Sequence, residues 1–269
     1  MFIKTLQILL IFIVVSNIFW LINSIRNCCL STKKSKNDPI KAYIITNNCS
    51  SNRFLSTKTN IERVFPKFFR ITCYLHVHWN DPRLHPVNLV EIRKPSSNLL
   101  TFLDLWSYVI PNEPNLLADD WVFIFEDDVN FIDPKNVSLV NFITPLKLLI
   151  ENVKIQNEHG FIYLGMCKRS LINSTVPFLL GNMSNTLQIG QGCGTCLHAT
   201  GITAKRAHSL WTEITEYRPN TDEFIDQQMQ EYCFRSGKEF LILGTNLASP
   251  FNQSHRGIAY QDRFKFKLH

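Results

Sequence analysis

Three consecutive acidic residues, Glu126-Asp127-Asp128, end an uninterrupted apolar segment that begins at Trp121. Adjacent carboxylates repel one another, and at the mouth of a buried strand this repulsion is costly unless a positive charge relieves it. Clustered hard oxygens usually find that charge in Mg²⁺ or Mn²⁺, which also bridges to substrate phosphates. The triplet therefore predicts a divalent-metal site for a phosphorylated substrate, and the alternative is a solvated acidic turn without a ligand.

The three acids are not equivalent if the chain stays extended through them. Residues two apart in an extended strand point the same way, so Glu126 and Asp128 are expected to face the metal together. Asp127 then points elsewhere, unless the strand has already ended. We rank Asp128 first as a metal ligand, Glu126 second and Asp127 third.

A second candidate ligand is His255, which is followed directly by Arg256. A neutral imidazole joins carboxylates more readily on Mn²⁺ than on Mg²⁺. Arg256 has the planar, charged group that suits a diphosphate. The alternative for His255 is an ordinary histidine in a surface loop.

Two acids further along the chain are candidates for a general base. Asp222 follows Pro219-Asn220 and occupies the expected N-cap of a helix over residues 222–236, where backbone amides would engage its carboxylate. Asp226 lies one turn further on the same face. Asp226 is therefore the predicted base and Asp222 the reserve, with a solvated i, i+4 pair as the alternative.

Residues 190–198 form a glycine-rich segment that contains Cys193-x-x-Cys196. Gly192 and Gly194 would let the backbone of a loop approach a ligand closely, since glycine has no side chain. The sequence has no second Cys-x-x-Cys and no thioredoxin-like context, so disulfides are a better interpretation of these cysteines than zinc or redox chemistry.

The elements that must position these residues alternate along the chain. Apolar runs predict strands over residues 42–46, 70–77, 121–125, 160–164, 196–203 and 241–243. Helices are expected over residues 99–110, 142–153, 204–217 and 222–236, the first with Ser96 or Ser97 as its cap. This alternation indicates an α/β fold with a mostly parallel central sheet flanked by helices, whose ligands bind at the carboxyl ends of the strands.

The acid triplet, together with Tyr163-Leu164-Gly165, resembles the glycosyltransferases of family 25, the lipopolysaccharide and procollagen galactosyltransferase group. The resemblance spans about residues 40–263 and implies the GT-A nucleotide-sugar fold. The family's usual Asn-Leu-Asp-Arg run after the first strand is replaced here by a run over residues 46–53, which ends in Arg53.

The resemblance also implies roles for the candidate residues. Glu126 and Asp128 would form the donor site, with the metal, Mn²⁺ or Mg²⁺, on Asp128. His255 would complete the metal site, and Arg53 and Arg256 would contact the diphosphate. Asp226 matches the family's helix-opening acid, and the segment with Gly192 and Gly194 resembles the loop on the acceptor side.

The amino-terminal region predicts a membrane anchor. We expect a short cytoplasmic tail over residues 1–5, a transmembrane signal anchor over 6–23, a stem over 24–39 and the catalytic domain over 40–269. A cleaved signal peptide is the alternative for the apolar segment. Basic residues after the anchor favour a cytosolic domain by the positive-inside rule.

Two other features favour the lumen. The chain has eight cysteines, of which six follow the stem: Cys49, Cys73, Cys167, Cys193, Cys196 and Cys233. It also has Asn-x-Ser/Thr sequons at Asn48, Asn136, Asn173, Asn182 and Asn252. We therefore expect a single-pass type II protein of the Golgi or endoplasmic reticulum membrane, with its catalytic domain in the lumen.

The net charge of +6 is spread along the chain without a basic stripe, so nucleic acid is not an expected partner. The family resemblance implies transfer of a hexose from a nucleotide-sugar to a hydroxyl of a glycan, lipid-linked or protein acceptor, with inversion. The alternative is a non-catalytic carbohydrate- or protein-binding module that has kept the same scaffold.

Overall fold

A computed structural model describes residues 38–84, 90–131, 140–170, 188–217, 224–244, 256–257 and 259–261. The compact unit that carries the fold begins at Pro39. The expected anchor and nearly all of the stem lie outside the described residues. Within the described ranges, no helix is both long enough and apolar enough to cross a membrane.

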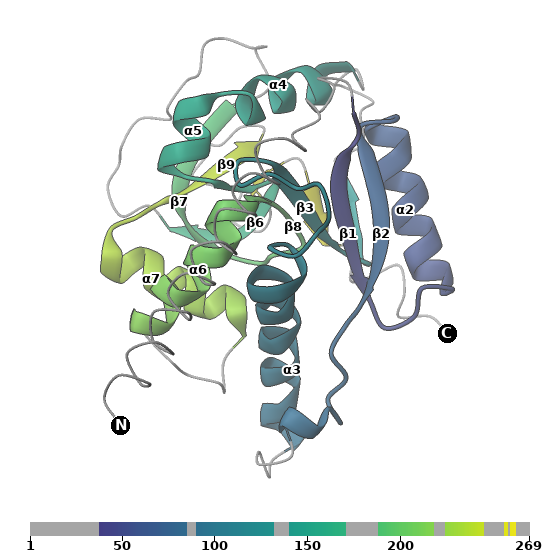
Figure 1. The fold of residues 1–269 in the computed structure, drawn as a ribbon, viewed down its shortest axis with the longest axis vertical. Coiled ribbons are helices and arrows are strands. Elements are labelled where there is room, and N and C mark those ends of the chain that lie inside the picture. Colours follow the sequence, from purple (N-terminus) through teal and green to yellow (C-terminus); the bar gives the residue numbers. More distant parts are fainter. Residues whose placement is uncertain are drawn as a thin grey trace, which may run out of the picture. The chain divides into compact units, whose positions relative to one another are not determined.

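A mixed sheet forms the centre of this unit (Figure 1). Its strands follow the order β10-β6-β7-β9-β5-β8-β3-β1-β2. Their bounds are β1 Ile40–Thr46, β2 Phe69–Leu75, β3 Trp121–Glu126, β5 Phe161–Tyr163, β6 Gly165–Ser170, β7 Gln188–Thr195, β8 Ala199–Thr203, β9 Phe240–Gly244 and β10 Arg256–Gly257. The strand pairing gives the directions within this sheet. One direction is shared by β2, β1, β3, β5, β9 and β6, and the opposite direction by β8, β7 and β10.

Helices cover both faces of the sheet, which confirms the predicted α/β class. They are α2 Asn52–Val64, α3 Val90–Asp104, α4 Val140–Ile150, α5 Val153–Glu158, α6 Ala204–Tyr217 and α7 Ile225–Ser236, with a π-helical turn, η2, over Leu105–Val109 and a 3-10 turn, η1, over Pro82–Leu84. A separate two-stranded ribbon pairs β4, Val129–Phe131, with β11, Ala259–Gln261. Six strands and four helices were expected, and each has a counterpart in this set.

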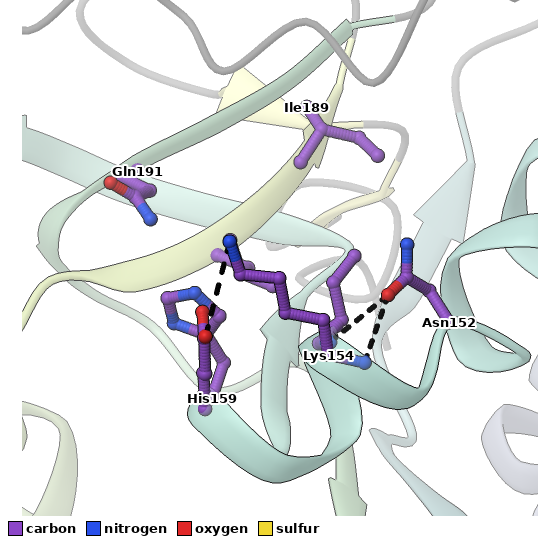
Figure 2. A pocket seen from close by; sticks show the side chains of 8 residues that line it. Asn152, Lys154, His159, Ile189 and Gln191 are labelled. Atoms are coloured by element: carbon purple, nitrogen blue, oxygen red, sulfur yellow. Dashed lines mark hydrogen bonds and ion pairs between the residues drawn. The ribbon is translucent and has the colours of Figure 1, made fainter.

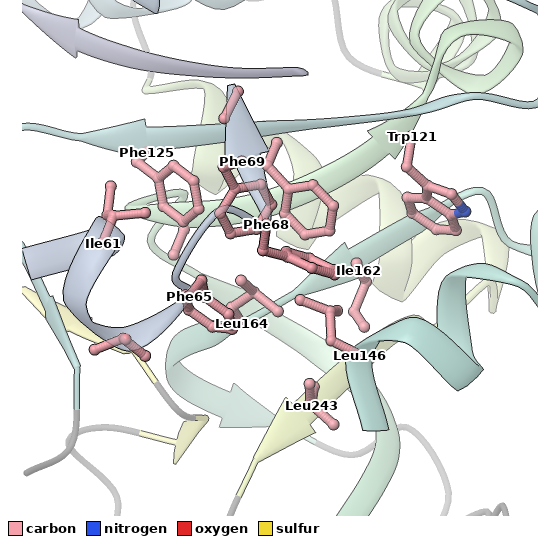
Figure 3. Close-up of a cluster of buried hydrophobic side chains, with 14 of the residues drawn as sticks. Ile61, Phe65, Phe68, Phe69, Trp121, Phe125, Leu146, Ile162, Leu164 and Leu243 are labelled. Atoms are coloured by element: carbon pink, nitrogen blue, oxygen red, sulfur yellow. The ribbon is translucent and has the colours of Figure 1, made fainter. Parts of the chain in front are cut away.

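The alternating side chains of β3 divide the core into two clusters. Phe123 and Phe125 belong to the cluster drawn in Figure 3, together with Phe65, the residue that caps the end of α2, and Leu146 of α4. Val122 and Ile124 point the other way, into a cluster with Trp106 of η2 and with residues of α6 and α7. Because both faces of β3 are buried, its sequence is continuously apolar up to Glu126.

Several sequence-based expectations were wrong in detail. The segment expected as a glycine loop is strand β7, paired with β9 from Gln188 opposite Gly244 to Gly192 opposite Phe240. Tertiary pairing here overrides the low strand propensity of glycine. Ser97 does not cap a helix but lies buried inside α3, where its hydroxyl donates to the carbonyl of Val77.

The prediction missed helix α2 altogether. Its buried residues, Phe54, Thr57, Ile61 and Val64, recur at helical spacing, and Ser51 caps its first turn by accepting from the amide of Phe54 at 3.1 Å. The signal was therefore present, but the polar residues between these positions obscured it.

Two disulfides join elements of this unit. Cys49 pairs with Cys73, and Cys193 pairs with Cys233. Cys196 is also disulfide-bonded. The Cys-x-x-Cys motif is therefore neither a dithiol nor a zinc half-site, because Cys193 is bonded to a residue of α7.

The centre of the sheet offers a test of the packing. Gly201 of β8 lies directly opposite Phe123 of β3 and Ile162 of β5. A methyl group at Gly201 would lie 2.7 Å from the Phe123 ring and 2.9 Å from Ile162. We expect Gly201→Ala to lower the free energy of unfolding by about 1–3 kcal/mol in urea denaturation, because the neighbours are packed core groups.

Gly237 provides the control, since it caps α7 with a positive φ and has open space around it. Gly237→Asn should cost less than about 1 kcal/mol, because asparagine tolerates the left-handed region. Equal losses in the two variants would contradict the packing argument.

Candidate functional site

The carboxyl ends of the parallel strands β1 and β3 meet the start of the antiparallel strand β8. Ile45 lies opposite Glu126 in the β1–β3 register. The Glu126 amide donates to the carbonyl of His198 at 2.9 Å, and the Asp127 amide donates to that of Ile45 at 3.1 Å. This is the edge at which open α/β sheets bind their ligands, and the acid triplet lies on it as predicted.

The guanidinium group of Arg53 bridges two of the three acids. Its Nε lies 2.8 Å from Oδ1 of Asp127, and its Nη2 lies 2.8 Å from Oδ2 of Asp128. Asp128 is 7% exposed, whereas the Arg53 side chain is 40% exposed, so their pair joins a buried carboxylate to a half-exposed cation. A cation of the protein itself therefore relieves the repulsion between the acids. The sequence had predicted that a metal ion would do so.

The triplet follows the stated exception to the expected division, in which the strand has already ended. Strand β3 ends at Glu126, and the chain turns over Asp127 and Asp128 before β4 begins. Alternation of an extended chain therefore no longer separates the two aspartates, and both reach Arg53. Asp127 is held further by the Thr46 hydroxyl, which donates to Oδ2 at 2.6 Å, and by Thr57, which donates to its carbonyl at 2.7 Å.

Local structure fixes the position of Arg53. It lies in the first turn of α2, just after the cap Ser51. The Cys49–Cys73 disulfide ties the segment before this cap to β2. A cation is disfavoured at a helix amino terminus because the helix dipole is positive there, so the acids opposite Arg53 are what stabilise it.

His76, which the sequence analysis did not consider, lies on the same edge. It follows β2 directly, and its amide donates to the carbonyl of Thr46 at 2.9 Å. Burial lowers the pKa of its imidazole, whereas a hydrogen bond at Val77 and the charge of Asp127 act to raise it. Its position at the end of a predicted parallel strand was the signal that could have identified it.

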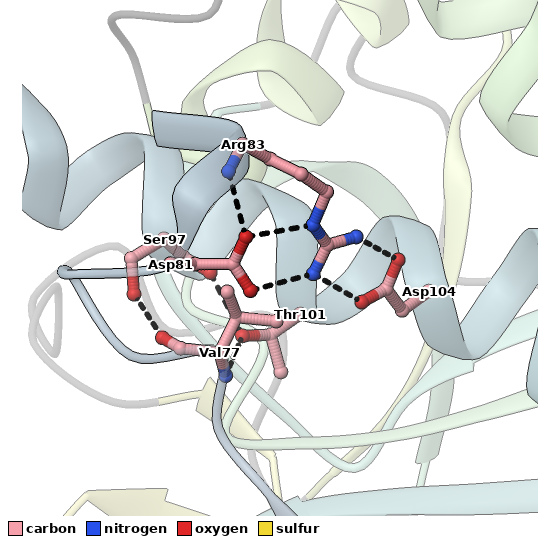
Figure 4. A network of polar contacts seen from close by, with 6 residues as sticks. All are labelled: Val77, Asp81, Arg83, Ser97, Thr101 and Asp104. Carbon is pink, nitrogen blue, oxygen red and sulfur yellow. Dashed lines mark hydrogen bonds and ion pairs between the residues drawn. The ribbon is translucent and has the colours of Figure 1, made fainter. Parts of the chain in front are cut away.

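Polar contacts hold the segment after His76 against α3, as Figure 4 shows. The guanidinium group of Arg83 donates to both carboxylate oxygens of Asp104 of α3, at 2.8 and 3.0 Å. It also donates to both carboxylate oxygens of Asp81, at 2.9 and 3.1 Å. Thr101 accepts from the amide of Val77 at 3.0 Å. These contacts fix the chain that leads away from the candidate site.

Asp226 approaches the same edge through the segment before β8. Its Oδ2 accepts from the amide of Cys196 at 2.9 Å, and Cys196 is two residues before His198. Burial raises the pKa of the Tyr163 phenol at the end of β5, and the charge of Asp226 adds to that shift. Asp226 therefore contacts the segment that leads to His198, whose carbonyl accepts from the amide of Glu126.

The helix that carries Asp226 differs from the expectation. Helix α7 begins at Ile225, and its N-cap residue is Phe224, which makes no side-chain cap. Asp222 is therefore not the cap residue, and it lies outside the described residues. Asp226 itself is in the first turn, where a carboxylate is favoured by the helix dipole.

The remaining candidates are placed only in part. Gly192 and Gly194 belong to β7, and Arg256 pairs with Met166 through the backbone of β10. His255 lies outside the described residues. Among the residues that are described, no group of three or more His, Cys, Asp or Glu side chains is arranged to hold a metal ion.

A cavity of about 130 Å³ lies at the opposite edge of the sheet, between α5 and the strands β7 and β9 (Figure 2). It is lined by Asn152, Lys154, Ile155, Glu158, His159, Ile189, Gln191 and Leu241. A neighbouring cavity of about 270 Å³ adjoins Phe161 and Phe240, the first residues of β5 and β9. Because these are the amino ends of parallel strands, the cavities are separate from the acid triplet.

The sequence matches no protein-family model, and no curated protein is significantly similar to it. The functional proposal therefore depends on the residues and on the geometry described above.

The Arg53 contacts change what is expected when an acid is neutralised. Asp128→Asn removes the buried carboxylate of an ion pair whose cation is half-exposed, so the free energy of unfolding should fall by about 1–2 kcal/mol without added metal. Asp119→Asn is the matched control on an exposed residue and should stay within about 0.5 kcal/mol of the parent. Chemical denaturation of both variants at neutral pH measures the difference, and an unchanged Asp128→Asn protein would contradict the ion pair.

Proposed function

We propose that the chain is a glycosyltransferase that binds a nucleotide-sugar at the carboxyl edge of β1 and β3 and transfers the sugar to an acceptor hydroxyl. The observation that carries the proposal is the placement of Glu126, Asp127 and Asp128 at the end of a buried strand, with Arg53 facing them. A nucleoside diphosphate needs cations around its phosphates, and a metal ion held by the carboxylates, together with Arg53, would supply them.

The chemistry of the acidic residues suits a divalent cation. Three carboxylates and one guanidinium give these four groups a net formal charge of −2, and carboxylate oxygens are the ligands that Mg²⁺ and Mn²⁺ accept. Asp128 and Glu126 are the residues that would hold the ion, with His255 as the expected third ligand. When bound, the ion would neutralise the departing diphosphate.

Asp226 is the group proposed to accept the acceptor's proton. In an inverting displacement, the acceptor oxygen forms a bond to the anomeric carbon as the bond to the diphosphate breaks, and the hydroxyl proton passes to the base. Backbone amides hold both oxygens of the Asp226 carboxylate, that of Cys196 donating to Oδ2 and that of Gln227 to Oδ1, each at 2.9 Å. A fixed carboxylate of this kind is favourable for catalysis because its geometry is set before the substrate arrives.

The compartment proposed is the lumen of the Golgi or endoplasmic reticulum, with the protein anchored by residues 6–23. Disulfides persist mainly in oxidising compartments, and two join elements of the folded unit. Asn48, the asparagine of the first sequon, is exposed. Sensitivity of the expressed protein to an endoglycosidase tests this part of the proposal.

A screen of nucleotide-sugars tests the function. With Mn²⁺ present, we expect one donor to be hydrolysed slowly by the parent protein and its nucleoside diphosphate to bind in calorimetry. Asp128→Asn should weaken that binding at least about tenfold, because it removes a metal ligand, whereas Asp119→Asn should bind as the parent does. Absence of binding across the panel would favour a non-catalytic module.

The role of Asp226 requires a separate assay. Asp226→Asn keeps the size of the side chain and an acceptor oxygen for Cys196, but it removes the proton acceptor. We expect transfer to fall by about a hundredfold or more while the affinity for the donor is retained. Glu231→Gln is the control, since Glu231 lies on the same helix and pairs with Arg235. Full transfer activity in Asp226→Asn would assign the base to another residue.

A further inference from the structure

The contacts of Arg53 place a protein cation on the acids that are proposed to hold a metal. One guanidinium spans Asp127 and Asp128 with two contacts of 2.8 Å. The geometry points to a competition: we propose that Arg53 and a divalent cation compete for the carboxylate of Asp128, and that Arg53, once displaced, would turn toward the diphosphate of the donor. This inference rests on the proposed function, for the metal at Asp128 and for the diphosphate.

The exchange follows from charge and burial. Asp128 is 7% exposed, so leaving it without a cation would cost much of its hydration. Arg53 meets that need when no metal is bound. A divalent ion on Asp128 would put two positive charges beside the guanidinium, and repulsion between the like charges would then weaken the pairs that Arg53 makes.

Arg53 is suited to leave, whereas the aspartates are not. Its side chain is 40% exposed, so much of the guanidinium already meets water. Asp127 is fixed by its amide, by its carbonyl and by the Thr46 hydroxyl. The released guanidinium stays attached to the first turn of α2, beside the edge where the diphosphate is proposed to bind.

The test measures affinity, in the full-length protein, for two ligands in sequence. Mn²⁺ alone is titrated first, without nucleotide, into the parent and into Arg53→Gln. A nucleoside diphosphate, chosen as the tightest binder among those of uridine, guanosine and adenosine, is then titrated at saturating Mn²⁺. We expect Arg53→Gln to bind Mn²⁺ about tenfold more tightly and the nucleoside diphosphate about tenfold more weakly than the parent does.

These opposite changes distinguish exchange from a structural role. A variant that only damages the fold weakens both affinities, and that result would overturn the competition, as would an unchanged affinity for Mn²⁺. Arg53→Lys should give intermediate values, because an ammonium cannot bridge both carboxylates in the same planar way. Arg63→Gln, at the other end of α2, should match the parent in both titrations.

Thermal melting provides a second readout that needs no nucleotide. Arg53→Gln should melt below the parent without metal, and Mn²⁺ should raise its melting temperature more than that of the parent. If the expected order for Mn²⁺ holds but no nucleoside diphosphate binds to either protein, the competition is supported and the proposed function is overturned. If neither protein binds Mn²⁺, both are overturned.

Discussion

The pairing of Arg53 with Asp127 and Asp128 is the interaction on which the candidate site depends. Two neighbouring carboxylates at the end of a buried strand need a cation, and the guanidinium group is placed to meet both. The surrounding structure serves that placement. Thr46 and Thr57 orient Asp127. The Ser51 cap begins α2 so that Arg53 falls in its first turn, and the Cys49–Cys73 disulfide ties the segment before the cap to β2.

The core explains why this edge can hold unfavourable charges. Alternate side chains of β3 enter two hydrophobic clusters, so the strand is anchored on both faces up to its last apolar residue. Burial of this kind supplies most of the stability of a domain. The edge can therefore carry adjacent acids, because the core supplies most of the stability and Arg53 offsets their repulsion.

The antiparallel strand β8 joins the two halves of the site. It lies between β3 and β5, and the segment that enters it carries both the Cys196 amide, which holds Asp226, and the His198 carbonyl, which accepts from Glu126. Cys196 adopts a φ of 71°, an unusual conformation for a residue with a side chain. Strain of this kind is sustained by surrounding structure, here by strand pairing and by disulfides.

The sequence by itself determined the α/β class, the strands β1, β3 and β8, the helix α6 and the position of the acids at a strand end, because apolar periodicity and its abrupt end are local properties. It could not decide that residues 188–195 form a strand, since glycines take that conformation only when a partner such as β9 is present. Nor could it supply the cation for Asp127 and Asp128. That choice depends on which side chain folding brings within 3 Å, and Arg53, more than 70 residues away in the chain, is placed there only by the packing of α2 against β1 and β4.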